Sequence, residues 1–147
     1  MTTSARSRPV PTPETRHFWD GTREHKLMLQ QCESCDHIYF PPRPFCPKCS
    51  ERRVKLLQAS GRATLYSYVI GQRPAPGFEP PYSIAVVTLE EGPRMMSNIV
   101  DCPQTPEALV LDMPLEVSWH AMDEEITLVM FKPVTEGAAP PAAGAGQ

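Results

Sequence analysis

Four cysteines in two closely spaced pairs are the residues of this sequence best suited to chemistry. Each pair has the form Cys-x-x-Cys, and ten residues separate the first pair, Cys32 and Cys35, from the second, Cys46 and Cys49. Two such pairs can present four thiolates in a tetrahedral array, the ligand set of a structural zinc site, and thiolates favour Zn²⁺ here over iron. Four protein ligands leave no position for water or substrate, so the predicted metal stabilises the fold and does no Lewis-acid chemistry. The short separation favours a compact zinc ribbon.

Other roles for the cysteines agree less well with the rest of the sequence. A thioredoxin-like redox pair needs a βαβ context, and neither pair has one. A disulfide framework needs an oxidising compartment, but the N-terminus, Met-Thr-Thr-Ser-Ala-Arg-Ser-Arg, lacks the apolar core of a secretory signal. We expect Cys102 to be an unreactive thiol, because the carboxylate of Asp101 would raise its pKa. His37 adjoins the first pair, but four thiolates suffice as ligands, and we expect it to face solvent.

A local excess of positive charge is the second feature that could serve a chemical function. Residues 43–62 hold six basic side chains and one acidic side chain, in a chain whose formal net charge is −3. The basic residues are Arg43, Lys48, Arg52, Arg53, Lys55 and Arg62. They could form a solvated surface, or a basic wall for phosphate groups, which arginine binds through paired hydrogen bonds. The acidic overall balance argues against a general nucleic-acid binder.

The segments that must position the cysteines are predicted to be a short helix and the strands of a ribbon. Thr12-Pro13-Glu14 is a helix-start pattern, and it predicts a helix that ends near Gly21. Phe18 and Trp19 on this otherwise polar helix are candidate interface anchors, unless they pack against the rest of the fold. Residues 26–32 and 36–40 alternate in polarity and predict the first two ribbon strands.

From residue 62 the sequence changes to alternating β-branched and aromatic residues. We predict strands over residues 62–70, 82–89, 94–100, 115–121 and 126–134. A proline-rich loop follows the first strand, and a second helix-start pattern, Thr105-Pro106-Glu107, predicts a short helix through Leu109. Three strands, a short helix and two strands is the element order of an OB-fold barrel. A five-stranded open sheet has the same order, so closure of the barrel is left open by the pattern.

The predicted fold class is therefore mainly β, with a short N-terminal helix, a zinc ribbon, a five-stranded OB-fold barrel and a disordered tail. The expected boundaries are residues 1–12 disordered, 13–29 helix and lead-in strand, 30–57 zinc ribbon, 58–135 OB-fold and 136–147 disordered tail. A chain of 147 residues can hold one ordinary domain or two small ones. No apolar run approaches the roughly 20 residues of a membrane-spanning helix, and we expect a soluble, cytoplasmic protein.

Several motifs, in this order, resemble the domain-of-unknown-function 35 family over roughly residues 16–134. They are Phe18-Trp19, Cys32-x-x-Cys35, Phe40-Pro41-Pro42-Arg43-x-x-Cys46-x-x-Cys49 and Ser60-Gly61-Arg62-Ala63-x-Leu65-Tyr66-Ser67-Tyr68. The resemblance implies a rubredoxin-like zinc ribbon joined to an acyl-CoA-associated OB-fold. It further implies a small accessory subunit of a thiolase-fold enzyme, or of a hydratase or aldolase acting on CoA thioesters. The missing glycine after Cys35 and the proline-rich loop 71–81 depart from the usual family pattern.

The resemblance also implies a set of partners and site residues. The catalytic subunit would supply the nucleophilic cysteine, so no catalytic residue is expected in this chain, and two such subunits could join a thiolase dimer. CoA or an acyl-CoA would be the ligand. The proline-rich loop would then be a rim that places Phe78 near an acyl chain or a partner surface, unless the loop only connects two strands. The candidate CoA-binding residues are Arg43, Arg52, Arg53, Lys55, Arg62 and Phe78.

Two other functional classes agree less well with the sequence. Zinc ribbons and OB-folds also occur in proteins that bind RNA or DNA. Few basic residues lie on the predicted barrel strands, where such ligands bind, and this makes a nucleic-acid-binding module the alternative rather than the leading hypothesis. A redox or metal-handling protein is disfavoured because four cysteines would close the metal site.

Overall fold

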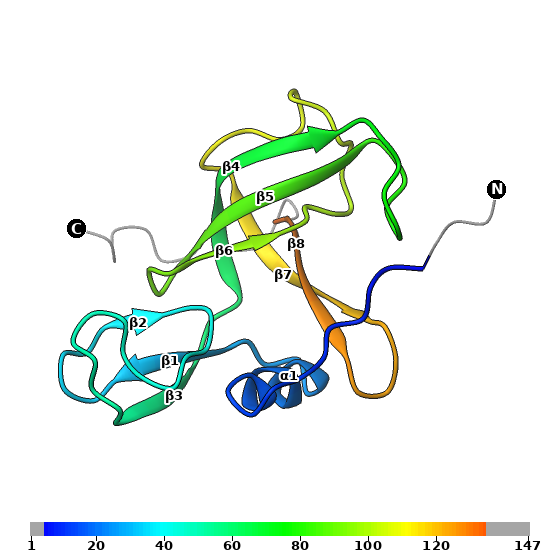
Figure 1. Ribbon diagram of the computed structural model, residues 1–147. Coiled ribbons are helices and arrows are strands. Elements are labelled where there is room, and N and C mark those ends of the chain that lie inside the picture. Colours follow the sequence, from blue (N-terminus) through cyan, green and yellow to red (C-terminus); the bar gives the residue numbers. More distant parts are fainter. Residues whose placement is uncertain (1–4, 135–147) are drawn as a thin grey trace.

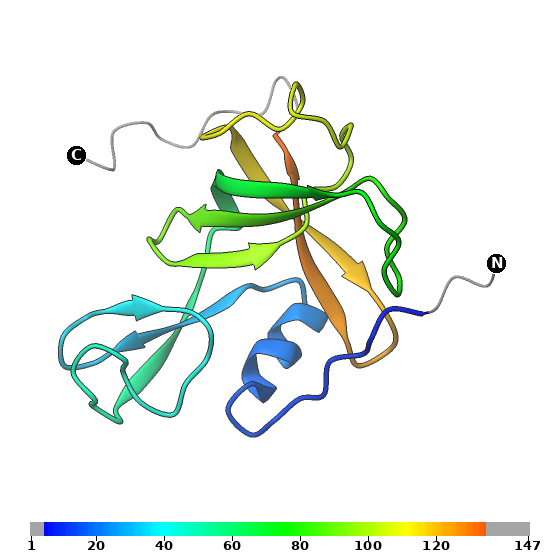
Figure 2. The same ribbon diagram turned by 45° about the horizontal axis from the view of Figure 1, so that its top comes forward.

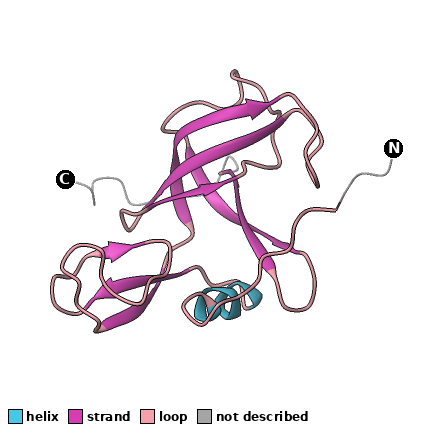
Figure 3. Ribbon diagram, viewed as in Figure 1, coloured by secondary structure: helices cyan, strands magenta, loops and turns pink. Residues whose placement is uncertain are grey.

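The computed structural model describes residues 5–134, which form one helix and eight strands and confirm the mainly β fold class (Figures 1 and 3). The elements are α1 (Arg16–Arg23), β1 (Met28–Cys32), β2 (Ile38–Tyr39), β3 (Val54–Gln58), β4 (Arg62–Gly71), β5 (Tyr82–Leu89), β6 (Arg94–Ser97), β7 (Pro114–Ala121) and β8 (Thr127–Pro133). The predicted tail, residues 136–147, lies outside the described residues. No helix in the described part of the chain is long and apolar enough to cross a membrane.

The ribbon is a three-stranded antiparallel sheet in the order β2-β1-β3. Its central strand, β1, ends at Cys32, so the sheet delivers the first metal-binding cysteine directly to the turn. On the other edge β3 pairs with all of β1, from Met28 opposite Gln58 to Cys32 opposite Val54. The segment between β2 and β3 carries the second cysteine pair. The sheet therefore places both pairs at the same end of the ribbon.

The barrel is a curled five-stranded antiparallel sheet in the order β6-β5-β4-β7-β8. Its two edge strands meet through a short parallel bridge between Ile99 and Phe131. Here the N–H of Val100 donates to the carbonyl of Phe131 at 2.8 Å, and the N–H of Phe131 donates to the carbonyl of Asn98 at 3.1 Å. A bulge between Leu65 and Ser67 in β4 allows the strong bend that a small barrel needs. The sheet is therefore a partly closed barrel with the predicted order of strands, although one turn replaces the predicted short helix before β7.

The ribbon, the helix and the barrel share one hydrophobic core. Leu27 and Leu29, from the ribbon side, belong to the same buried cluster as Leu65 and Phe131 of the barrel. Helix α1 lies beneath the barrel, between the ribbon and the β7–β8 hairpin (Figure 2). This continuous burial holds the metal-binding turns in a fixed position relative to the barrel.

Helix α1 uses its aromatic residues for this packing. Phe18 is only 6% exposed, and its ring centroid lies 5.4 Å from that of Phe40 in the ribbon. Trp19 is half-buried and contacts the edge of the Phe18 ring. Phe18 is therefore a core residue, and its interpretation as an exposed interface anchor is wrong. An eight-residue helix is too short to be stable alone, and its apolar face docks within the protein itself.

The predicted helices differ from the structure at three points. Helix α1 begins at Arg16, with Thr15 rather than Thr12 as its N-cap residue. Helix α1 also continues past Gly21 to Arg23. Gly21 is a close-packing position within the helix, since a Cβ there would lie 2.8 Å from Cγ of Met28. At Thr105 the helix-start chemistry forms, with the N–H of Leu109 donating to the carbonyl of Thr105 at 3.0 Å, but only one turn results. The chain then passes through a second turn, in which the N–H of Met113 donates to the carbonyl of Val110 at 3.2 Å, before β7 begins.

The N-terminal segment has contacts that its composition does not suggest. The sequence predicts disorder for residues 1–12, of which residues 5–12 are described. The guanidinium of Arg8 pairs with the carboxylates of Asp123 and Glu125, in the turn between β7 and β8. These contacts carry the segment along the β7–β8 hairpin toward the tip of loop 71–81 (Figure 1).

Candidate functional site

The four cysteines predicted to bind zinc are brought together by the ribbon. Their Sγ atoms all lie within 4.8 Å of one another. The Sγ atoms of Cys32 and Cys49 are 3.5 Å apart, and those of Cys35 and Cys46 are 3.7 Å apart. A tetrahedral Zn²⁺ with Zn–S bonds of about 2.3 Å holds its sulfur ligands about 3.8 Å apart. The donor set and its spacing therefore fit a structural zinc ion.

The two cysteine pairs form equivalent turns. In the first, the N–H of Asp36 donates to the carbonyl of Cys32 at 3.1 Å, and in the second the N–H of Ser50 donates to the carbonyl of Cys46 at 2.9 Å. Asp36 and Ser50 have φ angles of 61° and 67°, in the left-handed region. Turns of this kind usually place glycine there, and aspartate is among the residues that tolerate the conformation.

Backbone N–H groups in these turns point at the sulfur atoms. Ser34 and Cys35 donate to Sγ of Cys32 at 3.3 and 3.4 Å, and Lys48 donates to Sγ of Cys46 at 3.4 Å. Burial alone would raise the pKa of Cys46, but backbone N–H groups of its own turn and the neighbouring thiols outweigh it and lower the pKa to about 7. Backbone N–H donors of this kind favour the thiolate, which is the form that binds a metal.

The five basic residues predicted to meet CoA phosphates are exposed on the ribbon and at the start of β4: Arg43, Arg52, Arg53, Lys55 and Arg62. Arg53 pairs with Glu51 at 3.3 Å, and Arg62 pairs with Glu90 at 3.0 Å. Within residues 5–134 the other three form no ion pair with an acidic side chain. Those three cations are therefore available to an anionic ligand or partner.

Phe78, the sixth predicted residue, lies apart from the basic segment. It belongs to loop 71–81, whose tip is closed by a bridge between Ala75 and Phe78. Its ring packs against Tyr82, with centroids 5.0 Å apart, and carries the guanidinium of Arg6 at 4.1 Å from its centroid. Neither of the two hollows that Phe78 lines is lined by any of the five predicted basic residues.

The larger of these hollows is a groove between the helix, the ribbon and the barrel. It has a volume of about 330 Å³. We call it the aromatic groove, and define it by Phe18, Trp19, Phe40, Met95, Met96 and Met130. Phe78 and Arg6 complete one side of it. The walls of this groove are mostly apolar, and its charged lining residue is Arg6 rather than a residue of the basic segment.

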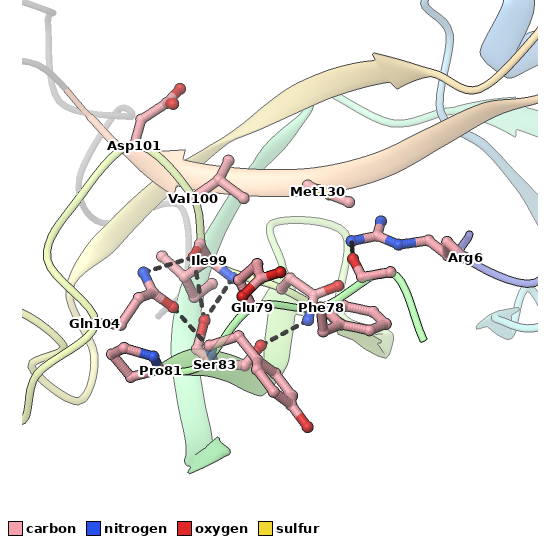
Figure 4. Close-up of a pocket in the computed structure, with 13 residues that line it drawn as sticks. Arg6, Phe78, Glu79, Pro81, Ser83, Ile99, Val100, Asp101, Gln104 and Met130 are labelled. Atoms are coloured by element: carbon pink, nitrogen blue, oxygen red, sulfur yellow. Dashed lines mark hydrogen bonds between the residues drawn. The ribbon is translucent and has the colours of Figure 1, made fainter. Parts of the chain in front are cut away.

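The smaller hollow lies beside loop 71–81 and has a volume of about 270 Å³ (Figure 4). A network of polar groups lines this hollow. The N–H of Ser83 donates to the side-chain carbonyl of Gln104 at 2.7 Å, and the Ser83 hydroxyl donates to the carbonyl of Ile99 at 3.1 Å. Asn98 adds a hydrogen bond to the carbonyl of Ser83. Because these groups satisfy one another, the network fixes the barrel where β5 meets the segment after β6.

Sequence reasoning missed Arg6. It lies 71 residues from Gly77, to whose carbonyl it donates at 3.5 Å, and the composition of residues 1–12 gives no sign of such a contact. The available signal was Arg6 and Arg8 in a segment that otherwise lacks charge up to Glu14. In an extended segment two arginines spaced two residues apart lie on the same face.

Other candidate reactive residues offer little chemistry. Burial and the nearby carboxylate of Asp101 raise the pKa of Cys102, in the predicted direction. Ser118 and His120 form a hydrogen bond of 3.0 Å on β7, but within residues 5–134 no carboxylate is hydrogen-bonded to His120. The His37 ring stacks on Tyr39, with centroids 5.9 Å apart. His37 is half-buried and does not belong to the cysteine cluster.

Two domain families match the chain in succession. Residues 19–54 match the family described as "ChsH2, rubredoxin-like zinc ribbon domain". Residues 57–120 match "ChsH2, C-terminal OB-fold domain". Together they span the ribbon and most of the barrel.

Related proteins carry names from CoA-thioester metabolism. A "Probable enoyl-CoA hydratase alpha subunit" of Thermomonospora curvata is 33% identical over 87% of this chain, which spans 40% of that relative. A "DUF35 domain-containing scaffold protein" of Pyrococcus furiosus is 35% identical over 71% of this chain and 76% of its own length. The "Benzoylsuccinyl-CoA thiolase subunit BbsA" of Thauera aromatica is 31% identical over 57% of this chain and 58% of its own length.

A solved structure has the same architecture. A chain of the "Ltp2-ChsH2(DUF35) aldolase" superposes with a TM-score of 0.76 and 32% sequence identity. The match covers 86% of this chain and 98% of that one. The ribbon-and-barrel arrangement described above is thus shared with a protein solved as part of an aldolase.

Proposed function

We propose that this chain is a non-catalytic subunit of a complex acting on CoA thioesters. It belongs to the DUF35 family of zinc-ribbon and OB-fold proteins. One observation carries the proposal: a four-cysteine ribbon and an OB barrel form a single body, as in the matching chain of the solved aldolase. Relatives in sequence are named as a scaffold and as subunits of a hydratase and a thiolase. The catalytic nucleophile belongs to the partner, a thiolase-fold subunit or its aldolase or hydratase counterpart.

The zinc ion in this proposal has a structural task. Four thiolates would hold it, and the metal supplies cross-linking of the two turns rather than chemistry on the substrate. The turns in turn fix the loops that carry Arg43, Arg52 and Arg53. The protein acts in the cytoplasm, where such thiols stay reduced.

The basic segment would bind the phosphate groups of CoA. Arg43, Arg52 and Lys55 are exposed and free of acidic partners within residues 5–134, and guanidinium groups match phosphate oxygens. Arg53 pairs with the half-buried carboxylate of Glu51 and Arg62 with the exposed carboxylate of Glu90. Pairs at the protein surface are weak enough to exchange for a phosphate. The assembly would contain two copies of this chain and two of the catalytic subunit.

The test is native mass spectrometry of the protein captured from its own cells under gentle salt, followed by CoA binding. We expect an accompanying thiolase-fold, aldolase or hydratase subunit. The double variant Arg52→Glu/Arg53→Glu should weaken CoA binding by at least about tenfold. A matched control is Arg23→Glu/Lys26→Glu, which makes the same charge change at exposed residues near the end of α1 and should leave CoA binding unchanged.

Two results would contradict the proposal. One is a protein that carries zinc but brings no CoA-thioester enzyme with it. The other is binding to single-stranded RNA or DNA that falls steeply with salt concentration, which would instead indicate the nucleic-acid-binding module.

A further inference from the structure

The aromatic groove has the composition of a site for an apolar ligand. Four aromatic rings, counting Phe78, and three methionines dominate its walls, and its volume of about 330 Å³ lies within the range of ligand pockets. Methionine side chains are flexible and adapt to ligands of variable shape. Met96 is 70% exposed although it lines this groove, so a ligand would remove a large apolar side chain from water.

One charged side chain, Arg6, lies in the wall of this groove. Its guanidinium lies over the Phe78 ring and donates a long hydrogen bond of 3.5 Å to the carbonyl of Gly77. Within residues 5–134 it forms no ion pair, although Glu79 and Asp101 line the adjoining smaller hollow. Figure 4 shows Arg6 and Asp101 at opposite ends of that hollow. Most of the guanidinium's N–H donors are therefore free.

A half-buried cation beside an apolar groove suits a ligand with an apolar body and a hydrogen-bond acceptor at one end. The Ser97 and Asn98 side chains, the other polar groups of the groove, already donate to backbone carbonyls, those of Val129 and Ser83. Arg6 is consequently the group that can orient a ligand there. A guanidinium donates well to a carbonyl oxygen, and it cannot lose its proton in doing so.

We propose that the aromatic groove holds the acyl part of the CoA thioester, with Arg6 donating to the thioester carbonyl oxygen. This inference rests on the proposed function, and it adds a site that the basic segment does not provide. The groove opens between the ribbon, which carries the basic residues, and loop 71–81, which carries Phe78. A thioester could thus extend from the ribbon surface into the groove.

The N-terminal segment is part of this site. Arg8 anchors it to the β7–β8 turn through Asp123 and Glu125, and Arg6, two residues earlier, reaches the groove. The Arg6–Phe78 contact forms the side of the groove nearest loop 71–81. Entry of a longer acyl chain would require this contact to shift, while the Arg8 anchor stays in place.

The groove contains its own spectroscopic reporter. Trp19 lines it, whereas the second tryptophan of the chain, Trp119, is not among its lining residues and stacks on His25, with centroids 5.3 Å apart. In a Trp119→Phe background, the fluorescence of Trp19 reports ligand binding in the groove. The probes are CoA, dodecanoyl-CoA and free dodecanoate.

We expect dodecanoyl-CoA to shift the Trp19 emission and to bind at least about tenfold more tightly than CoA, because only the acyl chain buries apolar surface in the groove. Met96→Asp should abolish that preference while CoA affinity stays unchanged, since a carboxylate would then face the chain. Arg6→Ala should reduce the preference for dodecanoyl-CoA over CoA by about tenfold. Val69→Asp is the matched control, because Val69 is 61% exposed on β4 and lines neither of the two hollows.

Three outcomes would overturn the inference. Equal affinity for CoA and dodecanoyl-CoA would show that the groove takes no acyl chain. A preference that survives both Met96→Asp and Arg6→Ala would place the chain elsewhere. Loss of the co-purifying enzyme subunit in Met96→Asp, with acyl preference intact, would make the groove a protein contact. The first two leave partner capture untouched, so they are distinguishable from failure of the proposed function.

Discussion

Asp36 and Ser50 occupy equivalent positions in the two metal-binding turns and share a left-handed backbone, with φ angles of 61° and 67°. Each follows the second cysteine of its pair, and each donates its N–H to the carbonyl of the pair's first cysteine. Neither is glycine, which pays no steric cost in this conformation. The turns therefore hold their cysteines in place at the expense of some backbone strain.

Ser50→Gly should accordingly stabilise the zinc-loaded protein. Relief of left-handed strain is worth about 1–2 kcal/mol, and the extra chain entropy of glycine removes about 0.5–1 kcal/mol of that gain. We expect a net increase of about 0.5–1 kcal/mol in the free energy of unfolding, measured by denaturant titration. Asp36→Gly should gain less, because aspartate tolerates this region. A loss of stability in Ser50→Gly would show that the serine side chain makes a contact worth more than the strain.

The ribbon could be predicted from the sequence because its information is local. Ligand type and spacing within Cys32–Cys49 define the metal site, and period-two alternation defines β4, β5 and β7. The second helix was predicted from Thr105, whose cap forms as expected. That cap specifies only a first turn. The backbone hydrogen bonds that would continue the helix do not form before the chain enters β7.

The groove could not be predicted in the same way. Phe18 becomes a core residue only because the ribbon and barrel enclose it, and nothing within its own polar helix encodes that. The pairing of Arg6 with Phe78 joins positions 72 apart in number, through a segment with the composition of a disordered arm. The candidate site therefore divides into a locally encoded metal centre and a groove made by tertiary packing.

Removal of one metal ligand should destabilise more than the ribbon. Cys46→Ser leaves three thiolates, and we expect loss of equimolar zinc, measured by elemental analysis. Because Leu27 and Leu29 share a core with Leu65 and Phe131, the barrel should lose stability together with the ribbon. The thermal transition, followed by circular dichroism, should move to a lower temperature as one event.

Cys102→Ser is the matched control for this experiment. It makes the same chemical change at a half-buried thiol outside the metal cluster, and zinc content should be unchanged. If Cys46→Ser retained full zinc, or if Cys102→Ser lost it, the assignment of the four ligands would be wrong. Separate transitions for ribbon and barrel would instead show that their shared core does not couple them.

Truncation of Phe18 should reveal how strongly the helix joins the two halves. Large-to-small changes at buried aromatic residues cost about 3–5 kcal/mol, and Phe18→Ala should fall in this range by denaturant unfolding. Arg23→Ala, at the exposed end of the same helix, should change stability by no more than about 0.5 kcal/mol. A similarly small effect for Phe18→Ala would mean that α1 contributes little to the core.

The anchor of the N-terminal segment should respond to acid. Hydrogen bonds from Arg8, followed by backbone N–H groups of the turn, lower the pKa of Asp123 from its ordinary value of 3.8 to about 2. Because the folded-state pKa is the lower one, the stabilising contribution is present above the ordinary value and is lost as pH falls from about 4 toward 2. Both partners are exposed, so high salt should weaken the contact.

Carboxyl titration by nuclear magnetic resonance should show the Asp123 pKa rising in Arg8→Ala, whereas Arg23→Ala should leave it at about 2. An unchanged Asp123 pKa in Arg8→Ala would mean that the backbone of the turn alone sets it and that Arg8 does not anchor the segment leading to Arg6.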